Sequence, residues 1–539
     1  MGHRKCAAAA ASSLLIACLS TAGPLSAQSR GLKAIRAADM KVHLDFLGAA
    51  EFAGRPAPSD AVEIASLYLA REAARRGLKP ILPDGSFFQS VPIEVGTISP
   101  ARSRLRLVTA GGEQVFFFPR SFGAQTMRGA TEGMFAGGVV FVGSTQEADE
   151  KTLAPVDLKG KMAVAIEAAV PEGPRPAAGS GAPFSLPLHL QDRGAVGLVT
   201  VVSTAQEMGL SEDGRDFDVN ERLLFPSVDM SGWSWRRRAA PGAFVQLEVR
   251  HETGAVILGI SRTELEMWFE KAARGESLPP TPVEGRSLAA EISLDTRSTS
   301  SSNVIGWIEG SDRKLRDEYI TITGHQDHLP RRDGRVLPGA DDNGSGAVAM
   351  LELIEALVIE RPKRSVIFVW STAEERGLVG AFHFVQHCPV PVERISANLN
   401  LDMISRNDRG MIYFVGSKAL STELDRILRA ANERSSRLRI DDSFQSAGHP
   451  DHFFFRSDQY PHIQYGIPGV WIFCGTTPDY HTPLDAIDRV DYAKMEKVTK
   501  FAYVACLDIG NAPALLKLDV RPDVTTRGAH NMTVDWLPR

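Results

Sequence analysis

Cysteine is scarce in this chain, and its scarcity excludes two kinds of structure. The 539 residues include five cysteines, of which Cys6 and Cys18 fall in an N-terminal segment that has the character of a signal peptide. Cys388, Cys474 and Cys506 remain, an odd number that cannot form a disulfide framework, although one disulfide is compatible with an exported protein. Their spacing also excludes a cysteine-based zinc cluster. Any metal must therefore be held by histidine and carboxylate side chains.

The chain also lacks a strong net charge. Its 60 basic and 65 acidic residues leave a formal charge of −5, which argues against a general nucleic-acid or polyanion binder. It contains neither the Gly-x-Ser-x-Gly pattern of serine hydrolases nor the His-Glu-x-x-His pattern of thermolysin-type zinc proteases. Those two hydrolase classes therefore have no support.

A long apolar run is missing too, apart from the N-terminus. There an apolar stretch at residues 7–19 follows a short basic start and is too short to span a bilayer comfortably. Small residues then end at Ala27, so we expect a signal peptide over residues 1–27 and a periplasmic or extracellular protein without a membrane span. The alternative is lipidation of Cys18, because residues 15–18 resemble a bacterial lipoprotein box.

The remaining length predicts two or three domains. A mixed helical and strand segment comes first, short apolar strands separated by Gly/Pro-rich loops follow, and strands and helices then alternate. We expect an α/β fold with a doubly wound, mostly parallel mixed sheet and an inserted β-rich domain. Later helices are predicted over residues 345–359, 378–387, 421–435 and 492–507. The expected boundaries are 28–125 for the N-terminal part of the α/β domain, 126–255 for the insertion, 256–512 for the catalytic domain and 513–539 for a C-terminal tail.

Polar residues recur at four successive places in the catalytic domain. Three follow or end apolar runs that are typical of buried strands, and the fourth opens a helix. Because the carboxyl ends of neighbouring strands meet in one crevice, we expect these side chains to converge. The clusters are His325-Gln326-Asp327 after residues 319–323, Asp341-Asp342-Asn343 before the helix, Glu374-Glu375 after residues 365–370, and Asp402 after residues 397–401.

Each cluster also has an ordinary structural explanation. His325 taken alone would be a buried structural histidine, Asp341 an N-cap, and Glu374 the exposed start of a helix. Asp402 is different, because a carboxylate in an apolar strand is costly unless it is paired or binds a metal. Together the clusters offer what a two-metal hydrolytic site needs: imidazole and carboxylate ligands, and a spare carboxylate that takes a proton from water.

The same segments resemble the di-zinc aminopeptidase family that also includes glutamate carboxypeptidase II. The resemblance covers residues 301–511, and the β-rich insertion resembles a protease-associated domain around residues 157–161 and 189–197. The matching motifs are GHQDH at 324–328, PGADDNGSG at 338–346, AEERGLVG at 373–380, NLDM at 400–403, RSDQY at 456–460, GIP at 466–468 and YHTPLD at 480–485.

The resemblance implies a role for each matched residue. It implies two zinc ions per chain, with His325 and Asp402 on one, Glu375 and His481 on the other, and Asp341 bridging both. Glu374 would be the general base. The position of Asp327, two residues after His325, independently predicts that its carboxylate accepts the other N–H of the imidazole. The resemblance also implies that the peptide bond between Asp341 and Asp342 is cis.

The expected activity is that of an exported, zinc-dependent aminopeptidase that removes N-terminal residues from peptides. A carboxypeptidase or dipeptidase of the glutamate carboxypeptidase type is the alternative, and Arg331, Arg332 and Arg335 could hold its substrate carboxylate. A single-zinc glutaminyl cyclase would not need five ligands. A receptor-like binding protein of the same fold predicts missing ligands, and none is missing from the sequence.

Overall fold

The computed structural model describes residues 30–52, 54–124, 132–145, 148–167, 185–202, 222–224, 244–331, 334–446, 449 and 451–521. The predicted signal peptide, with Cys6 and the proposed lipidation site Cys18, and residues 522–539 of the predicted tail lie outside this part of the chain. Within it, no helix has both the length and the apolar character needed to cross a bilayer. Cys388, Cys474 and Cys506 are free thiols.

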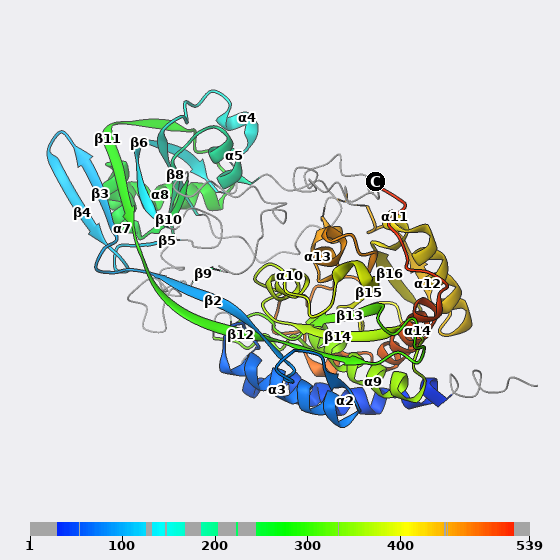
Figure 1. Ribbon diagram of the computed structural model, residues 1–539. Coiled ribbons are helices and arrows are strands. Elements are labelled where there is room, and N and C mark those ends of the chain that lie inside the picture. The colour runs from blue at the N-terminus through cyan, green and yellow to red at the C-terminus, as the bar shows by residue number, and fades with distance from the viewer. Residues whose placement is uncertain are drawn as a thin grey trace, which may run out of the picture.

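The larger of two sheets has a parallel centre that is joined on both sides by antiparallel pairings, β16 with β18 and β12 with β14, and its outer strand β17 pairs parallel with β16 (Figure 1). Its central strands β18, β15, β13 and β14 are mutually parallel and buried on both faces, which explains why their sequences are apolar rather than alternating. Its strands, in sheet order, are β17 (Arg439–Asp441), β16 (Met411–Val415), β18 (Gly469–Phe473), β15 (Ile395–Leu401), β13 (Tyr319–His325), β14 (Ser365–Ser371), β12 (Leu294–Ile308), β2 (Phe88–Ile98) and β9 (Arg222–Leu224), with β1 (Lys79–Pro80) paired to β12.

Helices cover both faces of this sheet (Figure 1). In β14, Phe368 and Trp370 pack into the large core with α9, whereas Ile367 and Val369 pack against α10. The first face carries α2 (Ala37–Leu47), α3 (Asp60–Arg75), α9 (Gly346–Ile359), α12 (Thr422–Arg434) and α14 (Tyr492–Asn511). The second carries α10 (Val379–Gln386) and α13 (Gln459–Gln464). Shorter helices are α11 (Ser417–Leu420) and the 3-10 turns Ala50–Phe52, Val392–Arg394, Phe453–Phe455 and Ile487–Arg489.

A second sheet forms a separate unit with its own apolar core. Strands β6, β7, β8 and β10 of this sheet are parallel, and its other pairings are antiparallel. In sheet order it contains β4 (Gly112–Phe117), β3 (Arg104–Thr109), β11 (Thr281–Ile292), β6 (Gly133–Ser144), β7 (Lys161–Ile166), β8 (Gly197–Val201), β10 (Val245–Val249) and β5 (Phe122–Ala124). The helices of this unit are α4 (Glu150–Leu153), α5 (Leu186–Asp192), α7 (His251–Leu258) and α8 (Arg262–Ala273).

The second sheet begins before, and ends after, the insertion predicted at residues 126–255. Strands β3 to β5 belong to it rather than to the α/β unit, and β11 lies between β3 and β6. The alternation of apolar and polar residues predicts a strand but does not show which strand it pairs with. The sequence therefore could not predict the pairing between residues 104–109 and 286–291. The long antiparallel pair β2 and β12 connects the two units (Figure 1).

Candidate metal centre and active site

The strand order brings the polar clusters to one edge of the larger sheet. β13 lies between β14 and β15 and is parallel to both, so the residues that follow the three strands emerge side by side. His325 ends β13, Glu374 follows β14, and Asp402 follows β15 directly. The segment Ala340–Ser345, which leads into α9, brings Asp342 to the same place.

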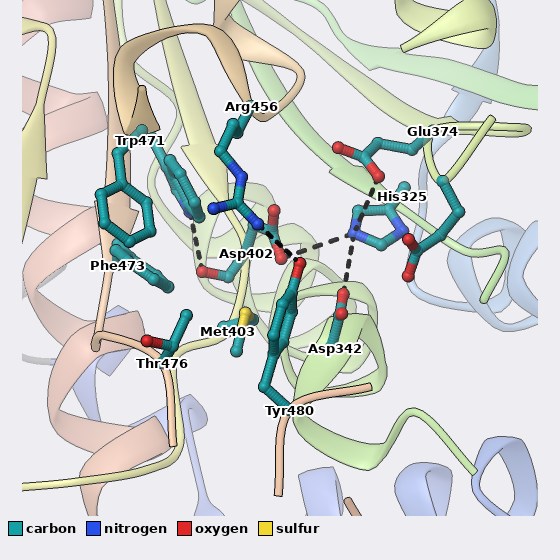
Figure 2. A pocket seen from close by; sticks show the side chains of 12 residues that line it. His325, Asp342, Glu374, Asp402, Met403, Arg456, Trp471, Phe473, Thr476 and Tyr480 are labelled. Carbon is teal, nitrogen blue, oxygen red and sulfur yellow. Dashed lines mark hydrogen bonds and ion pairs between the residues drawn. The ribbon is translucent and has the colours of Figure 1, made fainter. Parts of the chain in front are cut away.

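His325 is the centre of a first group of ligands (Figure 2). Its Nε2 lies 3.3 Å from Oδ1 of Asp342 and 3.4 Å from Oδ1 of Asp402. Oε2 of Glu374 is farther away, at 3.9 Å. All four side chains are buried, and an imidazole with two carboxylates at these distances could hold a metal ion.

Asp342 also belongs to a second group, through its other oxygen. Nε2 of His481 lies 3.1 Å from Oδ2 of Asp342 and 3.4 Å from Oε2 of Glu375. A further imidazole, His328, has Nδ1 2.9 Å from Oε1 of Glu375 and 3.9 Å from Oδ2 of Asp342. The structure thus brings together predicted residues from both halves of the site, with one carboxylate shared between them.

The shared carboxylate is Asp342, and not the predicted Asp341. Oδ1 of Asp341 accepts hydrogen bonds from the hydroxyl of Ser345 at 3.1 Å and from the backbone N–H and hydroxyl of Ser405 at 2.9 and 2.7 Å. Its side chain therefore supports the loop. The non-proline cis peptide also lies one residue later than predicted, between Asp342 and Asn343. Neighbouring residues point different ways, and the sequence alone does not show which of two adjacent aspartates faces the cleft.

Asp327 supports the site differently from the prediction. Nδ1 of His325 lies 3.1 Å from the backbone carbonyl of Asp327, while the Asp327 carboxylate is 3.8 Å away. That carboxylate instead accepts hydrogen bonds from the backbone N–H groups of Glu374 at 3.0 Å and Glu375 at 3.4 Å. It therefore fixes the turn that presents both glutamates.

Asp485 does the same for the loop that carries Asp342. Its two carboxylate oxygens accept hydrogen bonds from the N–H groups of Asp341, at 2.9 Å, and Asp342, at 3.0 Å. Because Asp485 and His481 belong to the same YHTPLD segment, this contact joins the two loops that supply the second group. The motif contained Asp485, but no sequence signal assigned it a role.

Arg55 is a buried cation beneath the site, only 1% exposed. Its guanidinium donates to the backbone carbonyls of Leu47, Gln326, Pro338 and Gly339 at 2.7 to 2.9 Å. These carbonyls belong to the N-terminal helix, to the loop after His325 and to the loop before Asp342. Arg55 therefore locks the N-terminal segment onto both ligand loops, and its charge lies close to the carboxylate cluster.

Burial and neighbouring charges shift the pKa values of the two adjacent glutamates in opposite directions. Burial raises the pKa of Glu374 well above its usual value, and the nearby charges of Glu375 and Asp402 add to the effect. Burial and the Asp342 charge also raise the pKa of Glu375, but the imidazoles of His328 and His481 outweigh both and bring it to about 2. Glu374 is thus suited to hold a proton and Glu375 to remain an anion.

The residues present fit divalent ions. Imidazole nitrogen and carboxylate oxygen are the donors that zinc accepts, and the 3.1 to 3.4 Å separations match the edge of about 3.4 Å expected between donors around zinc at ~2.0–2.2 Å. Among the described residues, Oδ1 of Asp402 and Oε1 of Glu375 are buried without a hydrogen-bond partner. A cation would satisfy both.

An aromatic wall completes the pocket beside the first group (Figure 2). The hydroxyl of Tyr480 accepts a hydrogen bond from Nη2 of Arg456 at 3.1 Å, and Arg456 forms no ion pair with any described carboxylate. Arg456 begins the RSDQY motif and Tyr480 begins the YHTPLD motif, but neither residue was assigned a role from the sequence. Met403, the last residue of the NLDM motif, also lines the pocket. The remaining lining residues, which sequence reasoning missed, are Phe453, Trp471, Phe473 and Thr476.

Residues 303–505 match the family model of Peptidase family M28. This M28 segment contains every imidazole and carboxylate of the site described above, including Glu374. In sequence the chain is similar to Aminopeptidase YwaD of Bacillus subtilis, 27% identical over 207 residues, which is 37% of this chain and 42% of that protein. It is also similar to a probable leucine aminopeptidase of Arthroderma otae, 29% identical over 219 residues, 36% of this chain and 58% of that protein. The alignments thus span about half of these relatives.

The fold around the M28 segment also has solved counterparts. An aminopeptidase from Aneurinibacillus sp. strain AM-1 aligns with a TM-score of 0.53 at 18% identity, over 92% of this chain and 99% of that structure. The zinc aminopeptidase BSAP from Bacillus subtilis aligns with the same TM-score and identity, over 91% and 99%. At this identity the likeness establishes a shared α/β fold.

Proposed function

We propose that this protein is an M28-type aminopeptidase that holds two zinc ions and removes single N-terminal residues from peptides. The observation that carries the proposal is the position of Asp342, whose two oxygens face two separate groups of imidazole and carboxylate ligands. Glu374 lies beside the first group as an additional carboxylate. A receptor-like protein of the same fold would have no reason to keep this complete and costly set.

His325, Asp342 and Asp402 would hold one ion, and Asp342, Glu375 and His481 the other. Zinc bound there would supply Lewis acidity and make water acidic enough to attack at neutral pH. Such an ion would also lower the pKa of nearby carboxyls by its charge. The protein's own contribution is to hold these ligands on rigid strand ends, so that little reorganisation is needed during the reaction.

Glu374 would move the proton. In the proposed reaction, its carboxylate takes a proton from the attacking water and later gives it to the leaving amine, as a general base and then a general acid. Burial raises the pKa of this group, and the charge of the bound ions would oppose that shift. Oε2 of Glu374 lies 3.9 Å from His325, close enough to act beside the first ligand group without being part of it.

Tyr480 and Arg456 would orient the scissile carbonyl. Because the Tyr480 oxygen accepts from Arg456, its own O–H remains available to donate to an oxygen that gains negative charge in the pocket. The aromatic wall of Phe453, Trp471 and Phe473 would take an apolar side chain from the N-terminal residue. We therefore expect large apolar residues to be preferred over charged ones.

A panel of substrates tests this proposal. Aminoacyl chromogenic substrates, the same substrates with an acyl-blocked amine, and short peptides would be compared before and after chelation, and again after zinc is added back. Cleavage that requires a free amine, stops on chelation and returns with zinc supports the aminopeptidase. Equal cleavage of blocked and free substrates would contradict it.

A carboxypeptidase or dipeptidase is the second candidate, and one observation favours it. Arg456 presents a cation to the pocket without a described carboxylate partner, so it could bind the carboxylate of a short substrate. The arginines predicted for that role are less suited, since Arg331 and Arg335 are exposed and Arg332 lies outside the described residues. Cleavage of dipeptides but not of their C-terminal amides would favour this candidate.

Export is also proposed, from the sequence of residues 1–27. Cell fractionation followed by mass spectrometry of the mature N-terminus tests it. A chain that starts after Ala27 supports secretion, a chain that starts at an acylated Cys18 supports a lipid anchor, and a cytoplasmic chain that still begins at Met1 contradicts both.

A further inference from the structure

His328 is an imidazole that the proposed ligand set does not use. Its side chain is fully buried, and its Nδ1 lies 2.9 Å from Oε1 of Glu375. Nevertheless neither of these two atoms forms a hydrogen bond of normal geometry with any residue in the described part of the chain. Two buried polar atoms thus approach each other closely without satisfying each other.

The ring of His328 is held in this place from several sides. Its backbone N–H donates to the carbonyl of Arg55 at 2.9 Å, and its ring lies edge-on to that of His481, with 5.8 Å between the centroids. At Gly339, which has a φ of +58°, a Cβ atom would come within 2.4 Å of Cγ of His328. The same Cβ would come within 2.3 Å of the backbone carbonyl oxygen of Asp342, so a larger residue at this position would clash both with the ring and with the ligand loop.

A cation would account for the contact between His328 and Glu375. A buried donor or acceptor left without a partner is destabilising, and a bound ion would remove that cost for both atoms. Two donors 2.9 Å apart are also compatible with neighbouring ligands of one ion. The same ion would be reached by His481, whose Nε2 is 3.4 Å from the other oxygen of Glu375.

We propose that His328 is a further protein ligand of the second metal position, with Asp342, Glu375 and His481. This inference rests on the two-metal function proposed above. It makes the two positions unequal, because the first has three protein side chains, from His325, Asp342 and Asp402, and the second has four. We expect the second position to bind zinc more tightly and to fill first.

X-ray absorption spectroscopy of the zinc-loaded protein counts the imidazoles directly. With three histidines on two ions, the spectrum of the unchanged protein should fit about 1.5 imidazoles per zinc, against about 1.0 if only His325 and His481 bind. His328→Ala should lower the count to about 1.0 and weaken the tighter of two sites seen by calorimetry. His387→Ala, which removes an imidazole elsewhere, should leave both measurements unchanged.

The outcomes separate the two proposals. A protein that carries two zinc ions at 1.0 imidazole per zinc, unchanged by His328→Ala, would overturn the role of His328 and leave the aminopeptidase intact. A protein that binds no zinc would overturn the proposed function itself, and His328 with it. Circular dichroism and thermal melting of the metal-free variants establish folding, and His328→Gln, which keeps a side chain of similar length, is the second variant if His328→Ala does not fold.

Discussion

The two units of this chain have cores of opposite character. In the described part of the second unit, residues 104–292, the buried polar side chains are all uncharged or imidazole, and none is Asp, Glu, Lys or Arg. The α/β unit instead buries many charged side chains beside its apolar core. They are Arg55, Asp327, Asp341, Asp342, Glu352, Arg364, Glu374, Asp402, Asp458, Asp479, Asp485 and Lys494.

This difference separates stability from chemistry. A buried charge is costly unless it is paired, hydrogen-bonded or bound to a metal. The described core of the second unit contains none and is stabilised by apolar packing. The α/β unit accepts the cost mainly at the edge of the sheet where β13, β14 and β15 end. Substituting a buried charged residue there should therefore change metal binding or turnover. Truncating a core residue of the second unit should instead lower stability.

The largest effect is expected from comparing Asp342→Ala with Asp341→Ala. Asp342→Ala removes the carboxylate that both ligand groups share, so it should abolish binding of both zinc ions and with it the activity. Asp341→Ala removes hydrogen bonds to Ser345 and Ser405 instead, and should cost about 1–3 kcal/mol of stability while the ions remain. Metal analysis measures the zinc content of each variant, and chemical unfolding measures its stability. Loss of both ions from Asp341→Ala alone would reverse the assignment.

The next largest effect is expected at Glu374. Glu374→Gln keeps the size and burial of the side chain but removes its ability to take a proton, so kcat should fall about 10²- to 10⁴-fold. The zinc content should stay at two ions, because Glu374 lies outside both proposed ligand sets. Steady-state kinetics on the best chromogenic substrate and metal analysis of the same sample measure this. Full activity in Glu374→Gln would exclude this residue as the base.

Much of the α/β unit could be predicted from the sequence, because its local signals agree with one another. The predicted helix over residues 345–359 is α9, and that over 421–435 is α12. The side chain of Ser421 caps α12, and the apolar residues that it buries recur at helical spacing: Leu424, Ile427, Leu428 and Ala431. The apolar runs before His325, Glu374 and Asp402 are buried strands, as expected of a parallel sheet.

The rest could not be predicted, for reasons that are physical. Asp341 and Asp342 are adjacent and identical in type, and only the local backbone decides which one faces the cleft. His328 and Arg55 depend on contacts between segments far apart in the chain, Arg55 with residues 326 and 338–339. Strand partners across a long insertion, such as β3 and β11, leave no local pattern.

In the second unit, a core truncation should cost stability without touching the metal. Leu247 in β10 is 1% exposed and packs in the apolar core of that unit. Leu247→Ala should therefore lower the free energy of unfolding of this unit by about 2–5 kcal/mol, with zinc content unchanged. Urea unfolding followed by circular dichroism measures the first, and metal analysis the second. Loss of zinc from folded Leu247→Ala would show that the two units are coupled more closely than their cores suggest.

The smallest effect concerns a buried carboxylate far from the metal ligands. Glu352 in α9 is fully buried, and one of its oxygens accepts from the N–H of Arg36 at 3.1 Å, while Arg76 is 3.9 Å from the other. Burial raises its pKa from 4.5 to about 7. The folded state thus holds a proton that the unfolded state releases between pH 4.5 and 7, so stability is lost as pH rises through that range.

Glu352→Gln removes this loss, because a neutral amide needs no proton to remain buried. The variant should be more stable than the unchanged protein at pH 8, by about 3 kcal/mol at most, and the difference should disappear near pH 4. Urea unfolding of the metal-free protein from pH 4 to 8 measures it without the pH dependence of zinc binding. The control is Glu355→Gln on the same helix, because the Glu355 side chain is 44% exposed. The difference in unfolding free energy between this variant and the unchanged protein should vary little with pH. If the difference in unfolding free energy for Glu352→Gln does not change with pH, the N–H of Arg36 and the charge of Arg76 already stabilise the ionised carboxylate. The α/β unit would then stabilise a buried charge by such contacts even away from its active site.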